Sequence, residues 1–383
     1  MGALFGVLRA QIEANAQQAV EIFTSEVPEY EASRRDVIDR DDMVDFAVFI
    51  RRRTLDLAAN GRPLEENDLS TFAEAGRIRA EAALTLASQQ RVVDLHTGRL
   101  LHEIRAASGP NTIGDLLRLV GWLGAQGVRA RAAYLNGYLD GADPPNAVAG
   151  RMELLAQALI ADEPVEWLPV DGLGVPMSDR YAVSVLRIPS PVPASQRHGV
   201  SHALADRRLV TAWLAPDELV ILTPLDGASE DVPLEQVRST VVAIGRACQV
   251  GSVDGVIGHL AESLSLARGL SRVAPLEDKP ARRYAVADLF AELSVAGTPQ
   301  IDTWLGGFAQ RLAAGPSLVE TLYAYYCHDM GRLATASALI IHPRTLDYRL
   351  QRVRDITGLD PASTAGVRIL SVVVARIRAR ELF

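Results

Sequence analysis

The sequence predicts a multidomain, mainly α-helical protein with an α+β domain in the middle of the chain. The 383 residues are enough for two or three domains that each bury a hydrophobic core. Apolar residues recur at helical spacing near both ends, whereas β-branched runs lie between residues 180 and 224. Proline-containing breaks at residues 143–146 and 274–283 predict domains at residues 1–142, 147–273 and 284–383.

The first domain is expected to be all-α. Phe46, Phe49 and Ile50 recur at helical spacing, and Asn60-Gly61-Arg62-Pro63 marks a helix end and a turn. The segment Leu69–Ile104 is rich in alanine, which is a good helix former, and lacks both proline and the alternation of a strand. We therefore expect helix along this segment.

The middle domain is expected to be α+β. Arg180–Ile188 is a β-branched run, and the strand-like runs Leu209–Ala215 and Leu219–Pro224 are separated by only three residues. So short a connection predicts an antiparallel hairpin within a small mixed sheet. The segments with helical patterns are Gln196–Ala205, Pro233–Ala247 and Val256–Leu270.

The last domain is expected to be an all-α bundle that ends in a helix-turn-helix. Leu318, Leu322 and Tyr325 put an apolar stripe on one helix, and a short helix is expected at Leu333–Leu339. Pro343 suits the first position of the next helix, where its missing N–H costs nothing. The other expected helices are Ala285–Leu293, Ile301–Ala314 and Ala362–Leu382.

The helix after Pro343 has two distinct faces. Leu346, Leu350, Val353 and Thr357 share one stripe at about 100° per residue. The opposite face and its flanks carry polar side chains suited to base edges and phosphates: Arg344, Asp347, Tyr348, Gln351, Arg352 and Asp355. This pattern predicts a recognition helix; a three-helix protein-interaction domain with a solvated charged face is the alternative.

The distribution of charge favours an anionic partner for this end of the chain. From Ser317 onward there are nine arginines and six acidic residues, a net charge of +3. The whole chain carries −8, so the remainder carries −11. A basic end on an acidic chain is typical of a local nucleic-acid contact.

The sequence supports neither a metal site nor a membrane anchor. Cys248 and Cys327 lack metal-binding spacing and are expected to be small buried side chains in a reducing cytoplasm. His198 and His202 lie four residues apart without a third ligand nearby. No apolar run reaches membrane-spanning length, and no signal peptide, P-loop or GxSxG motif is found, so we expect a cytoplasmic protein without a cofactor.

The C-terminal segment resembles the helix-turn-helix of the PucR/CdaR family of bacterial transcription regulators. The resemblance lies in Leu318-Val-Glu-Thr-Leu-Tyr-Ala-Tyr, Thr335-Ala336 with Leu339, His342-Pro-Arg-Thr-Leu-Asp-Tyr-Arg-Leu350, Arg352-Val353 and Thr357-Gly-Leu359. It implies a supporting helix at Leu333–Leu339 and a recognition helix at Pro343–Thr357. The residues then expected to contact DNA are Arg344, Thr345, Asp347, Tyr348, Gln351 and Arg352.

Two residues depart from the family's pattern. Asp347 stands where a basic or neutral residue is common, and it would accept a hydrogen bond from a cytosine amino group or from a neighbouring arginine. Leu333 stands where a Ser or Thr cap is common, which weakens the start of the supporting helix. Arg349 is expected to be structural and paired with an acid such as Glu320.

The middle domain resembles the GGDEF-like domain that precedes the helix-turn-helix in this family. The resemblance lies in Arg180–Ile188 and the hairpin Leu209–Pro224. Ala215 and Pro216 replace the two glycines that let the backbone approach a nucleotide in active cyclases. We therefore expect no cyclase activity, a role in dimerisation or sensing, and ordinary turn residues at Asp217 and Glu218.

The N-terminal domain resembles the sensor domain of RsbR-type stress-response proteins. The resemblance lies in Val27-Pro-Glu-Tyr30 and in the helical stretch Arg77–Arg105. It implies a globin-like helical fold without haem. His96 has no evident distal partner, so a packed or solvent-exposed histidine is expected there.

These observations predict a non-enzymatic, sequence-specific DNA-binding regulator that responds to an effector. Its expected partners are double-stranded DNA, further copies of the chain in a dimer or higher oligomer, and an unknown small-molecule or protein effector. The alternatives are a non-enzymatic scaffold in a stress-signalling assembly and a nucleotide-processing enzyme, which the hairpin turn argues against.

Overall fold

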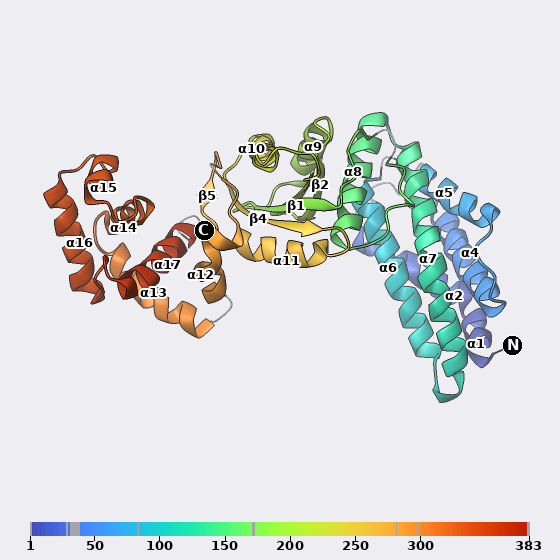
Figure 1. The fold of residues 1–383 in the computed structure, drawn as a ribbon. Helices are drawn as coiled ribbons and strands as arrows, with labels where there is room; N and C mark the ends of the chain where they lie inside the picture. Colours follow the sequence, from blue (N-terminus) through green and yellow to red (C-terminus); the bar gives the residue numbers. More distant parts are fainter. Residues whose placement is uncertain are drawn as a thin grey trace. The chain divides into compact units, whose positions relative to one another are not determined.

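Figure 1 shows the fold in a computed structural model, which describes residues 2–27, 30, 39–82, 84–170, 173–280, 282–296 and 299–380. The chain divides into two compact units. The first comprises Met1–Arg151 and Val165–Leu173, and the second comprises Met152–Pro164 and Gly174–Phe383. Helix α8 (Pro144–Ile160) runs through the boundary between them.

The first unit is built from helices, as its apolar spacing predicted. They are α1 (Ala3–Ala10), α2 (Ile12–Glu26), α4 (Arg40–Ala59), α5 (Glu66–Glu81), α6 (Leu86–Ala107) and α7 (Ile113–Gly141), with the short turn η1 (Pro110–Thr112) before α7. The segment expected to be helical along its length, Leu69–Ile104, is divided between α5 and α6. Thr85 caps the start of α6, because its hydroxyl accepts a hydrogen bond from the Ser88 N–H (3.3 Å).

Helices α5 and α7 approach so closely that glycine is required on both. A Cβ atom on Gly76 would lie 2.0 Å from the Tyr134 carbonyl oxygen. A Cβ on Gly137 would lie 2.0 Å from the Ala73 carbonyl oxygen. Because real Cβ atoms do not come that close, the two glycines determine how these helices cross.

A buried ion pair joins α4 to α6. The Arg51 Nη2 atom lies 2.7 Å from Glu103 Oε1, and both side chains are almost completely buried. The Arg51 Nε and Nη1 atoms donate to Glu103 Oε2 (3.1 Å) and to the Ala47 carbonyl (3.2 Å). Such a pair is tolerated in a core only because its hydrogen bonds replace those to water.

The second unit contains a five-stranded antiparallel sheet in the order β2-β3-β1-β4-β5. The α+β prediction is therefore confirmed for this part of the chain. Helices α9 and α10 pack on one face of the sheet and α11 packs on the other (Figure 1). The elements are β1 (Arg180–Arg187), α9 (Ala194–Ala205), β2 (Val210–Ala215), β3 (Glu218–Pro224), α10 (Val232–Ile244), β4 (Cys248–Val256), α11 (Leu260–Ser271) and β5 (Leu276–Glu277).

Strand β4 was not anticipated from the sequence. The helix expected at Val256–Leu270 begins only at Leu260, and β4 pairs along the whole of β1. Gly251 and Gly255 interrupt the β-branched pattern of β4, and they do so for packing reasons. A Cβ on Gly251 would lie 2.3 Å from the Ala267 carbonyl oxygen of α11.

The predicted hairpin is present, but Glu218 is not an ordinary turn residue. It is the first residue of β3 and is buried. Its carboxylate accepts hydrogen bonds from Arg187 Nη2 and Arg268 Nε, both at 2.6 Å. The earlier interpretation of Glu218 is therefore wrong, since burial of the hairpin end requires these charges to be compensated.

The C-terminal part of the second unit is a bundle of helices. They are α12 (Val286–Ala296), α13 (Pro299–Ala313), α14 (Leu318–Cys327), α15 (Arg332–Ala338), α16 (Pro343–Thr357) and α17 (Thr364–Arg380). Leu370, Val373 and Ile377 of α17 are buried in the core of this bundle. These α17 side chains therefore pack on their own bundle.

Two further predictions concern the burial of the two cysteines and the length and polarity of the helices. Cys248 is buried as expected, but Cys327 at the end of α14 is exposed, so the prediction of burial is wrong there. Within the described part of the chain, each helix is too short or too polar to cross a bilayer.

Candidate nucleic-acid interface

Helices α15 and α16 are joined by a tight turn. Ile340 in this turn has a positive φ of 54° and is 93% exposed. Pro343 begins α16 as predicted, and His342 caps that helix because its Nδ1 atom accepts a hydrogen bond from the Arg344 N–H (3.2 Å). A short helix, a tight turn and a longer helix form the helix-turn-helix arrangement.

The apolar stripe of α16 holds this helix on the bundle. Leu346, Leu350 and Val353 are buried in the same core as Leu322 of α14 and Leu370 of α17. The opposite face of α16 is thereby turned outward.

The six residues expected to contact DNA lie together on the exposed part of α16. All are exposed, and Tyr348 is 71% exposed. The Gln351 Nε2 atom donates to Asp355 Oδ1 (2.9 Å), which orients the amide along the helix surface. The set is Arg344, Thr345, Asp347, Tyr348, Gln351 and Arg352.

Asp347 contacts a neighbouring arginine, one of the two partners that the sequence left open. The Arg332 Nη1 atom at the start of α15 lies 3.4 Å from Asp347 Oδ1, and both side chains are more than half exposed. Arg332 was not among the residues predicted for the interface. A usable signal was its place in the first turn of a helix, where the macrodipole disfavours a cation without an acidic partner.

Arg349 contacts a neighbouring helix of the bundle, in keeping with the structural role expected for it, but its partner differs from the one expected. The half-buried Arg349 Nη1 atom donates to the Thr321 hydroxyl (3.1 Å), whereas Glu320 is exposed. Thr321 lies on the buried side of α14, and it is therefore the residue that meets α16.

The supporting helix starts without a side-chain cap. Gly331 occupies the cap position, one residue before α15 begins at Arg332. The expected lack of a Ser or Thr cap is therefore correct, although the cap is Gly331 rather than Leu333. Leu333 itself is 77% exposed on the first turn.

The two histidine rings of α9 lie close together and tilted, with their planes at 49° to each other. The His198 and His202 ring centroids are 4.3 Å apart. Over the residues that the structure describes, no group of three or more His, Cys, Asp or Glu side chains is arranged to hold a metal ion.

Two segments of the chain match known domain families. Residues 318–375 match the PucR C-terminal helix-turn-helix domain. Residues 13–143 match the N-terminal domain of the RsbT co-antagonist protein rsbRD. Both matches confirm resemblances that the sequence motifs predicted.

Three similar proteins differ in the share of the chain that their similarity covers. The carbohydrate diacid regulator of Escherichia coli is 26% identical over 351 residues, which cover 79% of this chain and 87% of that protein. The transcriptional activator PmfR of Paenarthrobacter nicotinovorans is 52% identical over 48 residues, or 12% of this chain and 10% of that one. An uncharacterized protein of Mycobacterium tuberculosis is 44% identical over 59 residues, and the match covers 15% of this chain and only 14% of that protein.

The chain is also similar to a solved structure. That structure is the regulator of polyketide synthase expression from Bifidobacterium adolescentis, with 18% sequence identity. The alignment covers 64% of this chain and 99% of that one, with a TM-score of 0.28. That score is too low to establish a common fold.

Proposed function

We propose, from the PucR-type helix-turn-helix domain at residues 318–375, that this protein is a sequence-specific DNA-binding transcription regulator of the PucR/CdaR type. The observation that carries the proposal is the outward polar face of α16. Its arginine, tyrosine and glutamine side chains are exposed on a helix held by a buried apolar stripe. That arrangement allows α16 to enter a major groove without disturbing the bundle.

The residues of this face have separate roles in the proposed contact. Arg344 and Arg352 carry the cations that bind phosphates or the acceptor edge of guanine. Gln351 suits an adenine edge, and Tyr348 and Thr345 carry hydroxyls for the phosphate backbone. Asp347 positions Arg332 on the same face through their ion pair.

We further propose that the regulator works as a dimer or higher oligomer. One helix-turn-helix reads one half-site, so specific binding requires a second copy. Exposed apolar side chains on α7 support self-association, because they recur at helical spacing along one face. They are Ile113, Leu117 and Val120.

The remaining domain assignments are part of the same proposal. We assign residues 1–142 to a globin-like, effector-sensing domain, residues 147–273 to a degenerate GGDEF-like domain, and residues 284–383 to the DNA-binding domain with its linker helices. The buried carboxylate of Glu218, already paired with Arg187 and Arg268, supports a non-enzymatic middle domain. The proposed location is the cytoplasm, where DNA is accessible.

A scaffold in a stress-signalling assembly is not favoured. A protein-docking bundle does not require a polar recognition face. The match of residues 318–375 to a DNA-binding domain supports the regulator instead.

The proposal is tested by fluorescence anisotropy with the full chain and the DNA upstream of its own gene, across a series of salt concentrations. We expect sequence-selective binding that weakens steeply with salt, and a loss of about 1–3 kcal/mol of binding free energy in Arg344→Ala. Arg272→Ala, another exposed arginine of the second unit, is the matched control and is expected to bind like the parent. The mass of the complex by light scattering reports the number of chains.

If the upstream DNA is not bound, fragments of genomic DNA are tested next. Equal binding of these fragments by the parent and by Arg344→Ala would contradict a role for the exposed face of α16. The scaffold hypothesis would then replace the regulator.

A further inference from the structure

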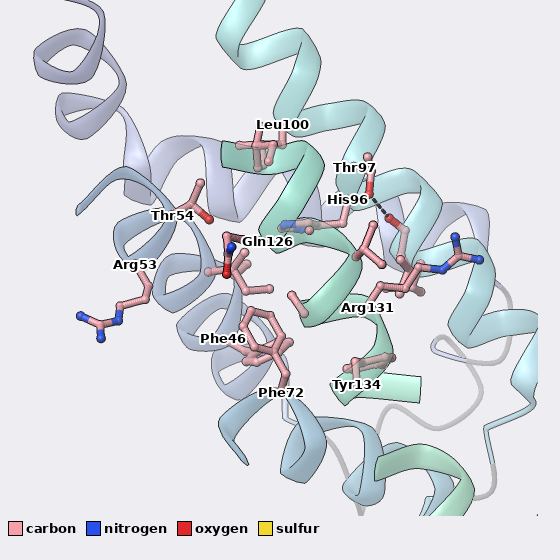
Figure 2. A pocket seen from close by; sticks show the side chains of 18 of the residues that line it. Phe46, Arg53, Thr54, Phe72, His96, Thr97, Leu100, Gln126, Arg131 and Tyr134 are labelled. Carbon is pink, nitrogen blue, oxygen red and sulfur yellow. Dashed lines mark hydrogen bonds between the residues drawn. The ribbon is translucent and has the colours of Figure 1, made fainter. Parts of the chain in front are cut away.

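A cavity of about 390 Å³ lies inside the first unit (Figure 2). Its walls come from α2, α4, α5, α6 and α7, and it is partly open to solvent, because the lining residue Leu101 is 49% exposed. Most of the lining is apolar, and Phe46, Phe72, Leu100 and Leu123 are among the residues that form it. Small-molecule sites in proteins have this size and character, with few polar groups among apolar walls.

One buried polar atom of the cavity wall has no hydrogen-bond partner among the described residues. The Nε2 atom of His96 on α6 is buried, and no hydrogen bond to it is made within the described part of the chain. Figure 2 shows the His96 ring directed toward the side of the pocket where Gln126 lies. A buried nitrogen without a partner costs free energy, and a ligand that hydrogen-bonds to it recovers that cost.

The imidazole of His96 is uncharged. Burial lowers the pKa of His96 to about 3, and the positive charge of nearby Arg51 lowers it further. A neutral imidazole has one nitrogen that donates and one that accepts. A hydroxyl group can do both, so it satisfies Nε2 in either tautomer.

Two of the three arginines that line the cavity direct their guanidinium groups away from it, and the third is held against an aromatic ring. Arg53 donates to Asp68 Oδ1 (2.6 Å) and Oδ2 (3.0 Å), and Figure 2 shows its guanidinium directed away from the pocket. Figure 2 shows the same for Arg131. The Arg79 Nη1 atom donates to the Ala75 carbonyl (2.8 Å), and its guanidinium carbon lies 5.2 Å from the Phe46 ring centroid.

We propose that this cavity binds a small, uncharged, mostly apolar molecule of roughly two rings, whose single hydroxyl group hydrogen-bonds to His96 Nε2. The size follows from comparison with a cavity of about 150 Å³, which holds one benzene molecule. The role of this cavity as an effector site rests on the function proposed above. Its ability to bind a small molecule does not depend on DNA binding.

Two glycines of α7 provide a matched pair of variants. Gly127 lines the cavity, and a Cβ atom added there meets nothing within 4 Å. Gly127→Leu therefore fills the space from a helix position where leucine is a better helix former than glycine. Gly121 is on the same helix, is exposed and has equally open surroundings, but does not line the cavity, so Gly121→Leu is the control.

The experiment is isothermal titration calorimetry of the full chain, without DNA, using three probes: 2-naphthol, naphthalene and 2-naphthoate. We expect 2-naphthol to bind one to one, naphthalene to bind at least fivefold more weakly, and 2-naphthoate to bind at least tenfold more weakly. Gly127→Leu should weaken 2-naphthol binding at least tenfold, whereas Gly121→Leu should not change it. His96→Leu should reduce the preference for 2-naphthol over naphthalene, and His102→Leu, at an exposed site on α6, should not.

No binding of 2-naphthol, or equal binding by the parent and Gly127→Leu, would overturn the proposal. Tighter binding of the anion would overturn the uncharged ligand class. Circular dichroism confirms that each variant is folded. The calorimetry contains no DNA, so its outcome and the outcome of the DNA-binding experiment are independent. A failure of 2-naphthol to bind would not contradict DNA binding, and a failure to bind DNA would not contradict the ligand site. Adding 2-naphthol to the anisotropy experiment then measures whether occupancy changes DNA affinity.

Discussion

The N-terminal helical unit and the C-terminal bundle place their polar groups in opposite ways. In the bundle, the core is apolar and the polar side chains of α16 face outward. In the N-terminal unit, charged and polar groups lie inside, including the Arg51–Glu103 pair and the unpaired nitrogen of His96. Outward polar groups are therefore available for a partner, whereas inward polar groups control stability and can hold a ligand.

A second polar cluster strengthens this contrast. The hydroxyls of Tyr30 and Tyr134 donate to the same Gln89 oxygen, at 3.0 and 2.6 Å. Burial raises the pKa of both tyrosines, so they remain protonated donors at neutral pH. The N-terminal interior is therefore organised by hydrogen bonds as well as by apolar packing.

The largest expected effect is on the buried ion pair. Glu103→Ala leaves the Arg51 cation buried without its partner, and we expect a loss of about 3–5 kcal/mol in the free energy of unfolding. Glu13→Ala breaks the exposed pair that Glu13 forms with Arg52 (3.3 Å), and it should cost less than about 1 kcal/mol. Urea unfolding followed by circular dichroism measures both, and similar losses would remove the contrast between interior and surface.

The next effect is a dependence of stability on pH through His96. Its pKa is about 3 in the folded protein and about 6.5 when exposed, so between these values the unfolded state binds a proton that the folded state does not. Stability therefore falls as the pH falls below 6.5, by about 2 kcal/mol at pH 5. His96→Leu should lose this component of the pH dependence.

The control for this measurement is His102→Leu, which changes an exposed histidine on the same helix. Its unfolding free energy should follow the pH in the same way as the parent. Parallel curves for the parent and His96→Leu would show that His96 is solvated in the folded state, contrary to its buried Nε2 atom.

The smallest effect concerns the turn of the helix-turn-helix. Ile340 is β-branched, exposed and held at a positive φ of 54°, which disfavours side chains of this type. Ile340→Gly should raise the unfolding free energy by about 0.5–1 kcal/mol, because relief of strain exceeds the entropic cost of glycine. Ile340→Val keeps the branch and should leave stability unchanged; a stability gain in both variants would exclude backbone strain as the cause.

The candidate DNA interface could be predicted because it depends on short distances along the chain. The spacing of Leu346, Leu350 and Val353 identified the buried side of α16, and all three are buried. Asp347 and Arg349 show where this reasoning ends. Their contacts, Arg332 and Thr321, lie on neighbouring helices, so the helix period alone does not identify them.

The sheet shows the same limit of prediction from residues that are close in sequence. The β2–β3 hairpin was predictable because its two strands are adjacent in sequence. Strand β4 was not, because Gly251 and Gly255 weaken the strand pattern and their reason lies in α11, which packs closely against them. The burial of Glu218 likewise depends on Arg268, fifty residues along the chain.

Residue spacing along the chain was enough to predict the helical domains at both ends of the chain, the antiparallel hairpin and the outward face of α16. Each of these follows from the period of one helix or from a single tight turn. The cavity around His96, the glycine-dependent crossing of α5 and α7, and the burial of Arg51 with Glu103 depend on the tertiary structure. These features join helices separated by tens of residues. Their energies arise from close packing and from the removal of polar groups from water, and both exist only after the helices have assembled.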